Sequence, residues 1–164
     1  MINKEITFTK VNLTYGWLGN MSPYPVTYEG KVWRTTEALF QALRFNDEEI
    51  REIIRNEKSP MGAKLKAKGI IKRVDPSKIS TNPLSEQDLE NMRLCIRLKI
   101  EQYPGLLKAL LETGNSKIYE DVSARGKRGS NLFWGALKEN GVWVGENHLG
   151  KIWEDLRDEI KNKQ

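Results

Sequence analysis

Cysteine and histidine are nearly absent from this chain of 164 residues, which holds one of each, Cys95 and His148. A single cysteine excludes a disulfide within the chain, and low cysteine content is typical of the reducing cytoplasm. One cysteine and one histidine also cannot supply the ligands of a structural zinc site. We therefore expect a cytoplasmic protein, in which any bound metal would have to be a hard ion with oxygen ligands.

Long hydrophobic runs are absent as well. The longest unbroken apolar runs, such as Ala38–Phe40, have three residues, whereas a membrane-spanning helix needs about 20. The first residues of the chain hold no apolar segment of the kind that a secretory signal requires. The glycine patterns of dinucleotide-binding and P-loop sites do not occur either. We expect no membrane span, no secretory signal and neither of these nucleotide sites.

Positive charge is in mild excess. The chain has 27 Lys and Arg against 22 Asp and Glu, which gives a net charge of +5. With 38% hydrophobic and 30% charged residues, its composition is near that of folded globular proteins and excludes intrinsic disorder. The excess is compatible with a nucleic acid or phosphate partner but does not require one.

The cations fall into two groups, one at positions 64–73 and one in a loop flanked by glycines. They are Lys64, Lys66, Lys68, Lys72 and Arg73, and then Arg125, Lys127 and Arg128. A run such as the first is either a solvated helix face or an edge that contacts phosphates. Both interpretations stay open.

Local patterns predict a predominantly helical α+β fold in a single domain over residues 1–164, with a small N-terminal hairpin and sheet. Alternating residues predict a strand over 6–9, and Glu29-Gly30 predicts the turn of a hairpin over 26–33. Capping residues and helical spacing predict helices over 36–45, 48–56, 61–68, 86–101, 104–113 and 149–160. The segment from Ser85 to Asp88 is similar to a capping box, and a further strand is predicted over 117–122.

Three polar residues share one face of the helix predicted over 36–45, namely Glu37, Gln41 and Arg44. A carboxylate, an amide and a guanidinium in line near a helix N-terminus can bind a polar ligand and supply an acid or a base. The alternative is that Glu37 complements the helix dipole and that the three residues form a solvated face. Spacing alone favours this alternative.

Tryptophan is abundant, with five in the chain. Trp153 lies on the apolar stripe of the last predicted helix and is predicted to be in the core, as is Cys95. Trp17 and Trp33 flank an irregular segment, and Trp134 follows the second basic loop. Aromatic rings on irregular segments can stack on a base, although core packing is the simpler explanation for each ring taken singly.

Four segments together resemble the NADAR family, and the match runs from about Tyr15 to Leu156 with the motifs in the family's order. They are GWLGNMSPYPVTYEGKVWRTTEALFQALRF, SPMGAKLKAKG, SEQDLENMRLCIRLKIEQYPGLLKALLETG and NLFWGALKENGVWVGENHLGKIWEDLR. The resemblance implies an N-glycosidase that uses no metal or other cofactor. Some members of the family cleave N-ribosyl intermediates of riboflavin synthesis, and others remove ADP-ribose from guanine in nucleic acid.

The resemblance also implies a set of site residues. Glu37 matches the family's motif glutamate and is the implied catalytic carboxylate, and Gln41 matches the glutamine four residues later. The positions implied to bind substrate are Asn20, Trp33, Gln41, Lys64, Asp121, Trp134, Gly135 and Asn147.

The chain departs from the family pattern at several positions. Many members have His after the glutamate, where this chain has Ala38, and they have Ser and Phe around the early asparagine, where it has Gly19 and Met21. Some members carry an acid after Trp-Gly, where it has Ala136, and an Asp-Trp pair that it lacks. These differences weigh against a riboflavin-pathway substrate and do not affect Glu37.

We therefore predict an N-glycosidase that hydrolyses a ribosyl or ADP-ribosyl N-glycosidic bond, above all one that removes ADP-ribose from guanine in nucleic acid or nucleotides. The expected partners are an ADP-ribose-containing or N-ribosyl substrate, ADP-ribosylated nucleic acid included, and no membrane. The expected assembly is a monomer or small oligomer. The alternatives are hydrolysis of riboflavin-pathway intermediates, a module that binds NAD or ADP-ribose without turnover, and a basic structural protein on nucleic acid. An intact Glu37 favours an enzyme over the last two.

Overall fold

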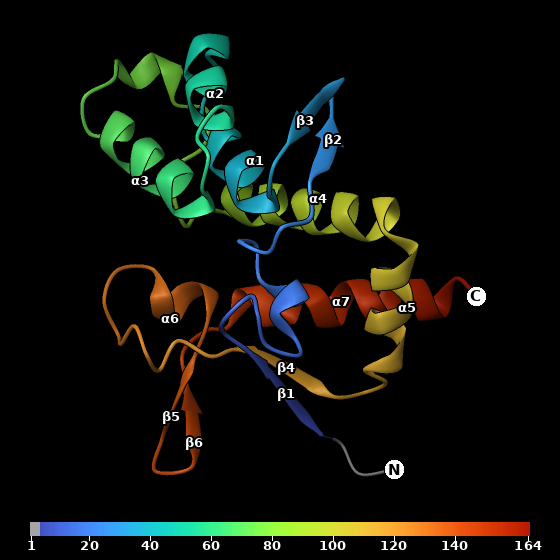
Figure 1. Ribbon diagram of the computed structural model, residues 1–164. Coiled ribbons are helices and arrows are strands. Elements are labelled where there is room, and N and C mark those ends of the chain that lie inside the picture. The colour runs from blue at the N-terminus through green and yellow to red at the C-terminus, as the bar shows by residue number, and fades with distance from the viewer. Residues whose placement is uncertain (1–3) are drawn as a thin grey trace. The chain divides into compact units, whose positions relative to one another are not determined.

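The computed structural model describes residues 4–164, which form two compact units. We call residues 20–102 the central unit, and residues 4–19 with 103–164 the terminal unit. Seven α-helices and three two-stranded sheets make up these residues (Figure 1). This confirms the prediction of a predominantly helical α+β fold. Within the described chain, no helix is long and apolar enough to cross a membrane.

The central unit is built around one short helix. Its elements are β2 (Val26–Tyr28), β3 (Lys31–Trp33), α1 (Thr36–Ala42), α2 (Glu48–Arg55), α3 (Pro60–Ile71), a 3-10 turn (Pro76–Lys78) and α4 (Glu86–Gln102). Helix α1 packs against α2, α3 and α4, and all of its residues are buried. The core of this unit therefore has α1 at its centre (Figure 1).

Local signals set the boundaries of the first elements. Strands β2 and β3 pair with Val26 opposite Trp33, and the turn residues Glu29 and Gly30 have φ angles of 49° and 77°. Two left-handed residues in succession make the type I′ turn that suits a twisted hairpin. The predicted hairpin is confirmed. The Thr35 side chain accepts a hydrogen bond from the backbone N–H of Ala38 and so caps α1, as predicted.

Helix α1 ends earlier than the predicted limit at Phe45. The fully buried Phe45 leaves the helix and forms an isolated antiparallel bridge with Ile79. The backbone N–H of the next residue, Asn46, donates to the carbonyl of Lys78 at 3.0 Å. Pairing with a distant segment competes with helical hydrogen bonds, so local spacing cannot show where this helix ends.

The terminal unit joins segments from both ends of the chain. Its elements are β1 (Glu5–Phe8), a 3-10 turn (Gly16–Leu18), α5 (Pro104–Glu112), β4 (Lys117–Glu120), α6 (Asn131–Trp134), β5 (Leu137–Glu139), β6 (Val142–Val144) and α7 (His148–Asn162). Strand β1 pairs in parallel with β4, with Ile6 opposite Ile118. Helix α7 packs against β4 and α5. The N-terminal strand thus pairs with a strand from the second half of the chain and not with the predicted hairpin.

The hairpin of β5 and β6 was missed by the sequence prediction. These two strands pair antiparallel, with Leu137 opposite Val144, and Asn140 and Gly141 at the turn have φ angles of 52° and 78°. Asn-Gly is among the strongest short-range signals of such a turn. Strands β5 and β6 have three residues each, as β2 and β3 do, so the turn residues are the signal that could have revealed this hairpin.

Trp153 is the largest fully buried side chain and belongs to the core, as predicted. Its indole N–H donates to the carbonyl oxygen of Leu18 at 3.0 Å. Its ring meets Trp17 edge to face, with the centroids 5.6 Å apart. Helix α7 is thereby tied to the 3-10 turn near the start of the chain.

Replacing Trp153 with Ala should lower the free energy of unfolding by about 3–5 kcal/mol, because it leaves a large cavity and an unpaired buried carbonyl. Denaturant unfolding followed by circular dichroism measures the loss. Trp143→Ala is the matched control, since Trp143 is only half-buried in the same unit. A loss in Trp153→Ala no larger than in the control would contradict the core assignment.

Candidate active site

The polar face of α1 lies inside the central unit. Only 7% of Glu37 and 4% of Gln41 are exposed, and the side chain of Arg44 is 11% exposed. The interpretation of these residues as a solvated face is therefore wrong. A carboxylate and an amide removed from water in this way need protein partners, or their burial is costly.

These partners come first from the helix itself. The side-chain amide of Gln41 donates from Nε2 to Oε1 of Glu37 at 3.0 Å. The guanidinium of Arg44 donates from Nη1 to Oε1 of Gln41 at 3.1 Å. The three predicted residues are thus one continuous hydrogen-bonded row.

A fourth member of the row, Asp88 on α4, was missed by the sequence analysis. Its carboxylate is fully buried and accepts from Nε and Nη2 of Arg44 at 3.0 and 2.7 Å, and from the backbone N–H of Leu84 at 2.9 Å. Ser85 caps α4 as expected by accepting from the N–H of Asp88. The cap explains the position of Asp88 in the sequence but gives no hint of its partner Arg44, which follows the end of α1.

Asn20 fixes the start of α1. Its backbone carbonyl accepts from the N–H of Glu37 at 3.1 Å, and its side-chain oxygen accepts from the hydroxyl of Thr36 at 3.0 Å. Its amide nitrogen donates to the sulfur of Met92. The structure therefore brings Asn20, Glu37 and Gln41 together, with the side chain of Asn20 bonded to the protein.

Cys95 on α4 is fully buried, which confirms its prediction as a core residue. Burial raises the pKa of its thiol, and the negative charges of Glu37 and Asp88 raise it further. A thiol in such a place is an inert packing group and not a nucleophile.

Trp33 and Lys64 have other surroundings. Trp33 lines a pocket of about 200 Å³ with Leu39 and Ala42 of α1 and with Leu43, which follows the helix, and Glu37 does not line it. The buried indole N–H of Trp33 has no hydrogen-bond partner among residues 4–164. Lys64 is half-buried on α3. A role for either residue in substrate binding stays a prediction.

The other four predicted residues belong to the terminal unit, where two of them secure the backbone. A Cβ at Gly135 would lie 2.6 Å from the carbonyl oxygen of Glu120, so only glycine fits. Asn147 adopts a left-handed conformation. Its side chain accepts from the N–H of Glu120 at 3.0 Å and donates to the carbonyl of Ile118 at 2.8 Å. Both polar ends of Asn147 thus bind β4.

Asp121 and Trp134 lie on either side of the basic loop. The Asp121 carboxylate accepts from the backbone N–H of Ser123 at 2.9 Å, which closes a turn. Trp134 is half-buried, and its ring meets that of Phe133 edge to face, with the centroids 4.9 Å apart. A role for either residue in substrate binding stays a prediction.

The NADAR domain family matches residues 7–161. The chain belongs to the NADAR family. It is 32% identical to N-glycosidase YbiA of Escherichia coli K12 over 155 residues, which cover 94% of this chain and 88% of YbiA. The NMR structure of E. coli YbiA matches with a TM-score of 0.76 and 31% identity, over 99% of this chain and 88% of that one.

Two further relatives carry different names, one an N-glycosidase and the other a riboflavin biosynthesis protein. An N-glycosidase of Nostoc punctiforme is 28% identical, over 96% of this NADAR chain and 93% of that protein. A riboflavin biosynthesis protein of Vibrio vulnificus is 25% identical over 98% of this chain but 40% of that protein. The predicted family is confirmed, and the relatives named N-glycosidases support a glycosidase enzyme.

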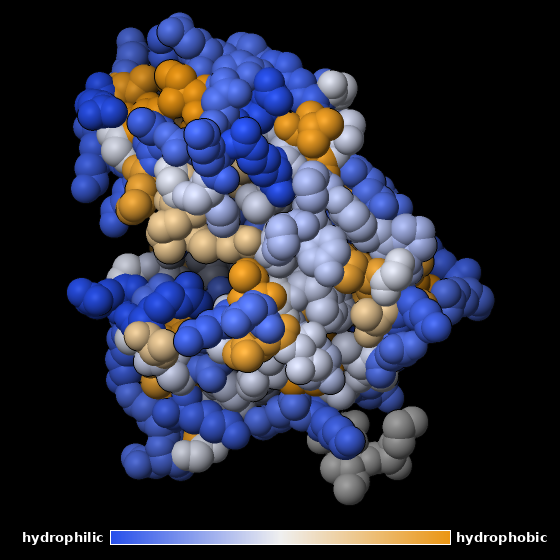
Figure 2. Space-filling view, viewed as in Figure 1, coloured by the Kyte–Doolittle hydropathy of each residue, from blue (hydrophilic) through white to orange (hydrophobic). Residues whose placement is uncertain are grey.

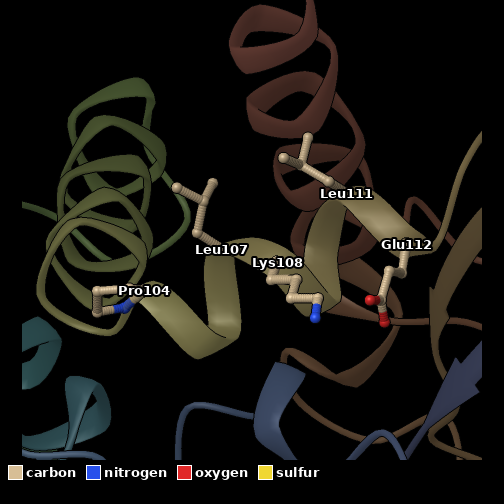
Figure 3. Close-up of a pocket in the computed structure, with 5 residues that line it drawn as sticks. All are labelled: Pro104, Leu107, Lys108, Leu111 and Glu112. Atoms are coloured by element: carbon tan, nitrogen blue, oxygen red, sulfur yellow. The ribbon is translucent and has the colours of Figure 1, made fainter.

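A separate pocket of about 450 Å³ lies on α5 of this NADAR chain (Figure 3). Its lining residues are Pro104, Leu107, Lys108, Leu111 and Glu112. All of them come from one helix, and none is a predicted site residue. Between residues 4 and 164, no three His, Cys, Asp or Glu side chains are grouped to hold a metal ion.

Helix α4 also buries a lysine that the sequence analysis did not single out. The Lys99 ammonium donates to the hydroxyl of Ser22 at 2.7 Å and lies 5.1 Å from the centre of the Tyr24 ring. Burial lowers the pKa of Lys99 to about 7, because the charged form is poorly solvated there.

Lys99→Met should therefore raise the free energy of unfolding most below pH 7, where Lys99 is charged in both the folded and unfolded chain. This gain in the free energy of unfolding should shrink as the pH rises from 7 toward the unfolded-state pKa of about 10.4. Urea unfolding at pH 6, 8 and 10 measures this dependence. Lys108→Met on exposed Lys108 of α5 should show no such trend, and a flat profile for Lys99→Met would refute the lowered pKa.

Proposed function

We propose that this chain hydrolyses a ribosyl or ADP-ribosyl N-glycosidic bond, and that its substrate is ADP-ribosylated guanine in nucleic acid or nucleotides. The observation that carries the proposal is the buried carboxylate of Glu37, which is held by Gln41 at the family's glutamate position. The relatives named N-glycosidases support the reaction type.

The reaction requires stabilisation of positive charge. Breaking a bond between C1′ and a base nitrogen gives the ribose ring oxocarbenium character. A carboxylate placed beside the ring stabilises this charge, and it acts more strongly where water is excluded. Gln41 occupies Oε1 of Glu37, whereas Oε2 makes no hydrogen bond within residues 4–164. We assign Oε2 to face the ribose or the attacking water.

Lys64 of the central unit and Trp134 of the terminal unit are each proposed, taken singly, to contact substrate. Lys64 forms no ion pair with any residue of the described chain and can meet a phosphate as a point charge. The half-exposed ring of Trp134 can stack on a base.

A second candidate substrate is an N-ribosyl intermediate of riboflavin synthesis, which the name of the Vibrio relative favours. The departures at Ala38 and Met21 weigh against it. Incubation with ADP-ribosylated guanine oligonucleotide, NAD and N-ribosyl pyrimidines in parallel, with product masses as the readout, distinguishes the candidates. No product from any of them would leave a module that binds its ligand without turnover.

Glu37→Gln should lower the rate of base release by about 10²–10⁴, the usual scale for a positioned acid or base. The change keeps the side chain's volume and removes its charge, so circular dichroism should show a folded protein. Turnover under substrate saturation is the measurement. Glu86→Gln is the matched control, because Glu86 lies in the first turn of α4 and is exposed.

The control should keep its full rate. If a folded Glu37→Gln protein also turned over at the wild-type rate, Glu37 would only complement the dipole of α1.

The cations of α3 and of its C-terminal cap, Lys72, test whether the substrate is a polymer. Lys66, Lys68 and Lys72 are exposed. The Nζ atom of Lys66 forms an ion pair with Oε1 of Glu57 at 3.6 Å. Figure 2 shows apolar groups among hydrophilic ones over the region of α2 and α3, and Met61 and Leu65 are exposed on α3.

Replacing Lys66, Lys68 and Lys72 with Gln should flatten the salt dependence of binding to a modified oligonucleotide. Each phosphate contact contributes a slope of about −0.7 on single strands and about −0.9 on duplex DNA in a plot of log K against log salt. Fluorescence anisotropy over a salt series measures the slope. Cleavage of a free ADP-ribosylated nucleoside is the control and should not change. Equal slopes before and after would indicate a solvated face and a small substrate.

A further inference from the structure

The hydrogen-bonded row of the central unit has a fixed direction. A carboxylate only accepts hydrogen bonds, and a guanidinium only donates them. Gln41 lies between one of each and presents a different end to each: its NH2 group to Glu37 at 3.0 Å and its carbonyl to Arg44 at 3.1 Å. The two neighbours therefore decide which way the amide of Gln41 points.

Arg44 is itself held in place from the other side. Two parallel hydrogen bonds join it to the fully buried carboxylate of Asp88, at 3.0 and 2.7 Å. This bidentate pairing fixes the plane of the guanidinium. The guanidinium carbon Cζ of Arg44 also lies 4.8 Å from the centre of the Phe40 ring. Asp88 in turn accepts from the backbone N–H of Leu84, so the row is anchored in the backbone before α4.

We propose that Asp88 is a positioning residue for the reaction. Through Arg44 it fixes the amide of Gln41, which holds Oε1 of Glu37 and leaves Oε2 for the substrate. This inference rests on the proposed function, in which Glu37 is the catalytic carboxylate. Asp88 acts only through its neighbours and does not touch the substrate.

The physical reason is the symmetry of the Gln41 amide. Its two ends have almost the same shape, so a half-turn of the terminal bond costs little in packing. Without a donor on the far side, the carbonyl can turn toward Glu37, where two acceptors repel each other. The carboxylate then moves, and a displacement of about 1 Å can cost about 10²-fold in rate.

A double-mutant cycle with Glu37→Gln separates positioning from a general effect on the fold. In the wild-type background, Asp88→Asn should lower kcat by about 10- to 100-fold with little change in KM. In the Glu37→Gln background, the same change should alter the residual rate by less than about 2-fold, because the carboxylate that it positions is gone. Single-turnover assays, corrected for the folded fraction by circular dichroism, supply these rates.

A second variant keeps the test decisive if Asp88→Asn folds poorly. Gln41→Met keeps the length of the side chain, removes its donor and acceptor, and leaves the Arg44–Asp88 pair intact. Gln41→Met should likewise lower kcat in the wild-type background and leave the residual rate of the Glu37→Gln background nearly unchanged. Glu90→Gln is the matched control on α4, because Glu90 pairs with Arg93 at the surface, and it should leave kcat unchanged in both backgrounds.

Three results would overturn the proposal. An equal fall in kcat in both backgrounds, or no fall in either, would show that Asp88 serves the fold alone, with the role of Glu37 intact. An unchanged rate in Glu37→Gln by itself would refute the proposed function and the positioning role with it.

Discussion

The burial of a polar helix face is the constraint on which the central unit depends. Helix α1 lies among α2, α3 and α4, and water cannot hydrate its carboxylate and amide groups. Except for Oε2 of Glu37, the groups are satisfied by one another and by Asp88 of α4. A buried polar network with all its members paired specifies one arrangement. The same constraint that makes α1 costly to bury therefore holds Glu37 in place for its proposed role in catalysis.

The family's motif residues divide by what they contact. The side-chain amides of Asn20 and Asn147 form hydrogen bonds that stabilise the fold. Asn20 does so at the start of α1, and Asn147 does so on β4. Gly135 is required because no Cβ fits beside Glu120. Glu37 differs from them, because one of its carboxylate oxygens is left without a protein partner within the described chain. Asn20, Asn147 and Gly135 therefore support the fold, and Glu37 is the motif residue with a proposed role in catalysis.

The elements predicted correctly are those whose signals are local. Thr35 precedes α1 and Glu29-Gly30 forms the turn of β2 and β3, and each acts through atoms within four residues of itself. The hairpin of β5 and β6 had a signal of the same kind in Asn140-Gly141, and its strands are as long as those of the predicted hairpin, yet the sequence analysis overlooked it. The sequence therefore held the turn signal for this hairpin, and the prediction did not use it.

By itself, the sequence determined six of the seven helices of residues 4–164, the caps of the first four, one hairpin and the row of Glu37, Gln41 and Arg44, because helical geometry brings residues three and four apart together. The four-residue helix α6 was not predicted. Only the tertiary structure decided that this row is buried and that it ends on Asp88. Arg44 and Asp88 are 44 positions apart, and β1 meets β4 across a still longer stretch. Nothing local distinguishes Asp88 from the other acids near it. Its partner is chosen by the packing of α1 against α4, which places one carboxylate, out of water, against one guanidinium.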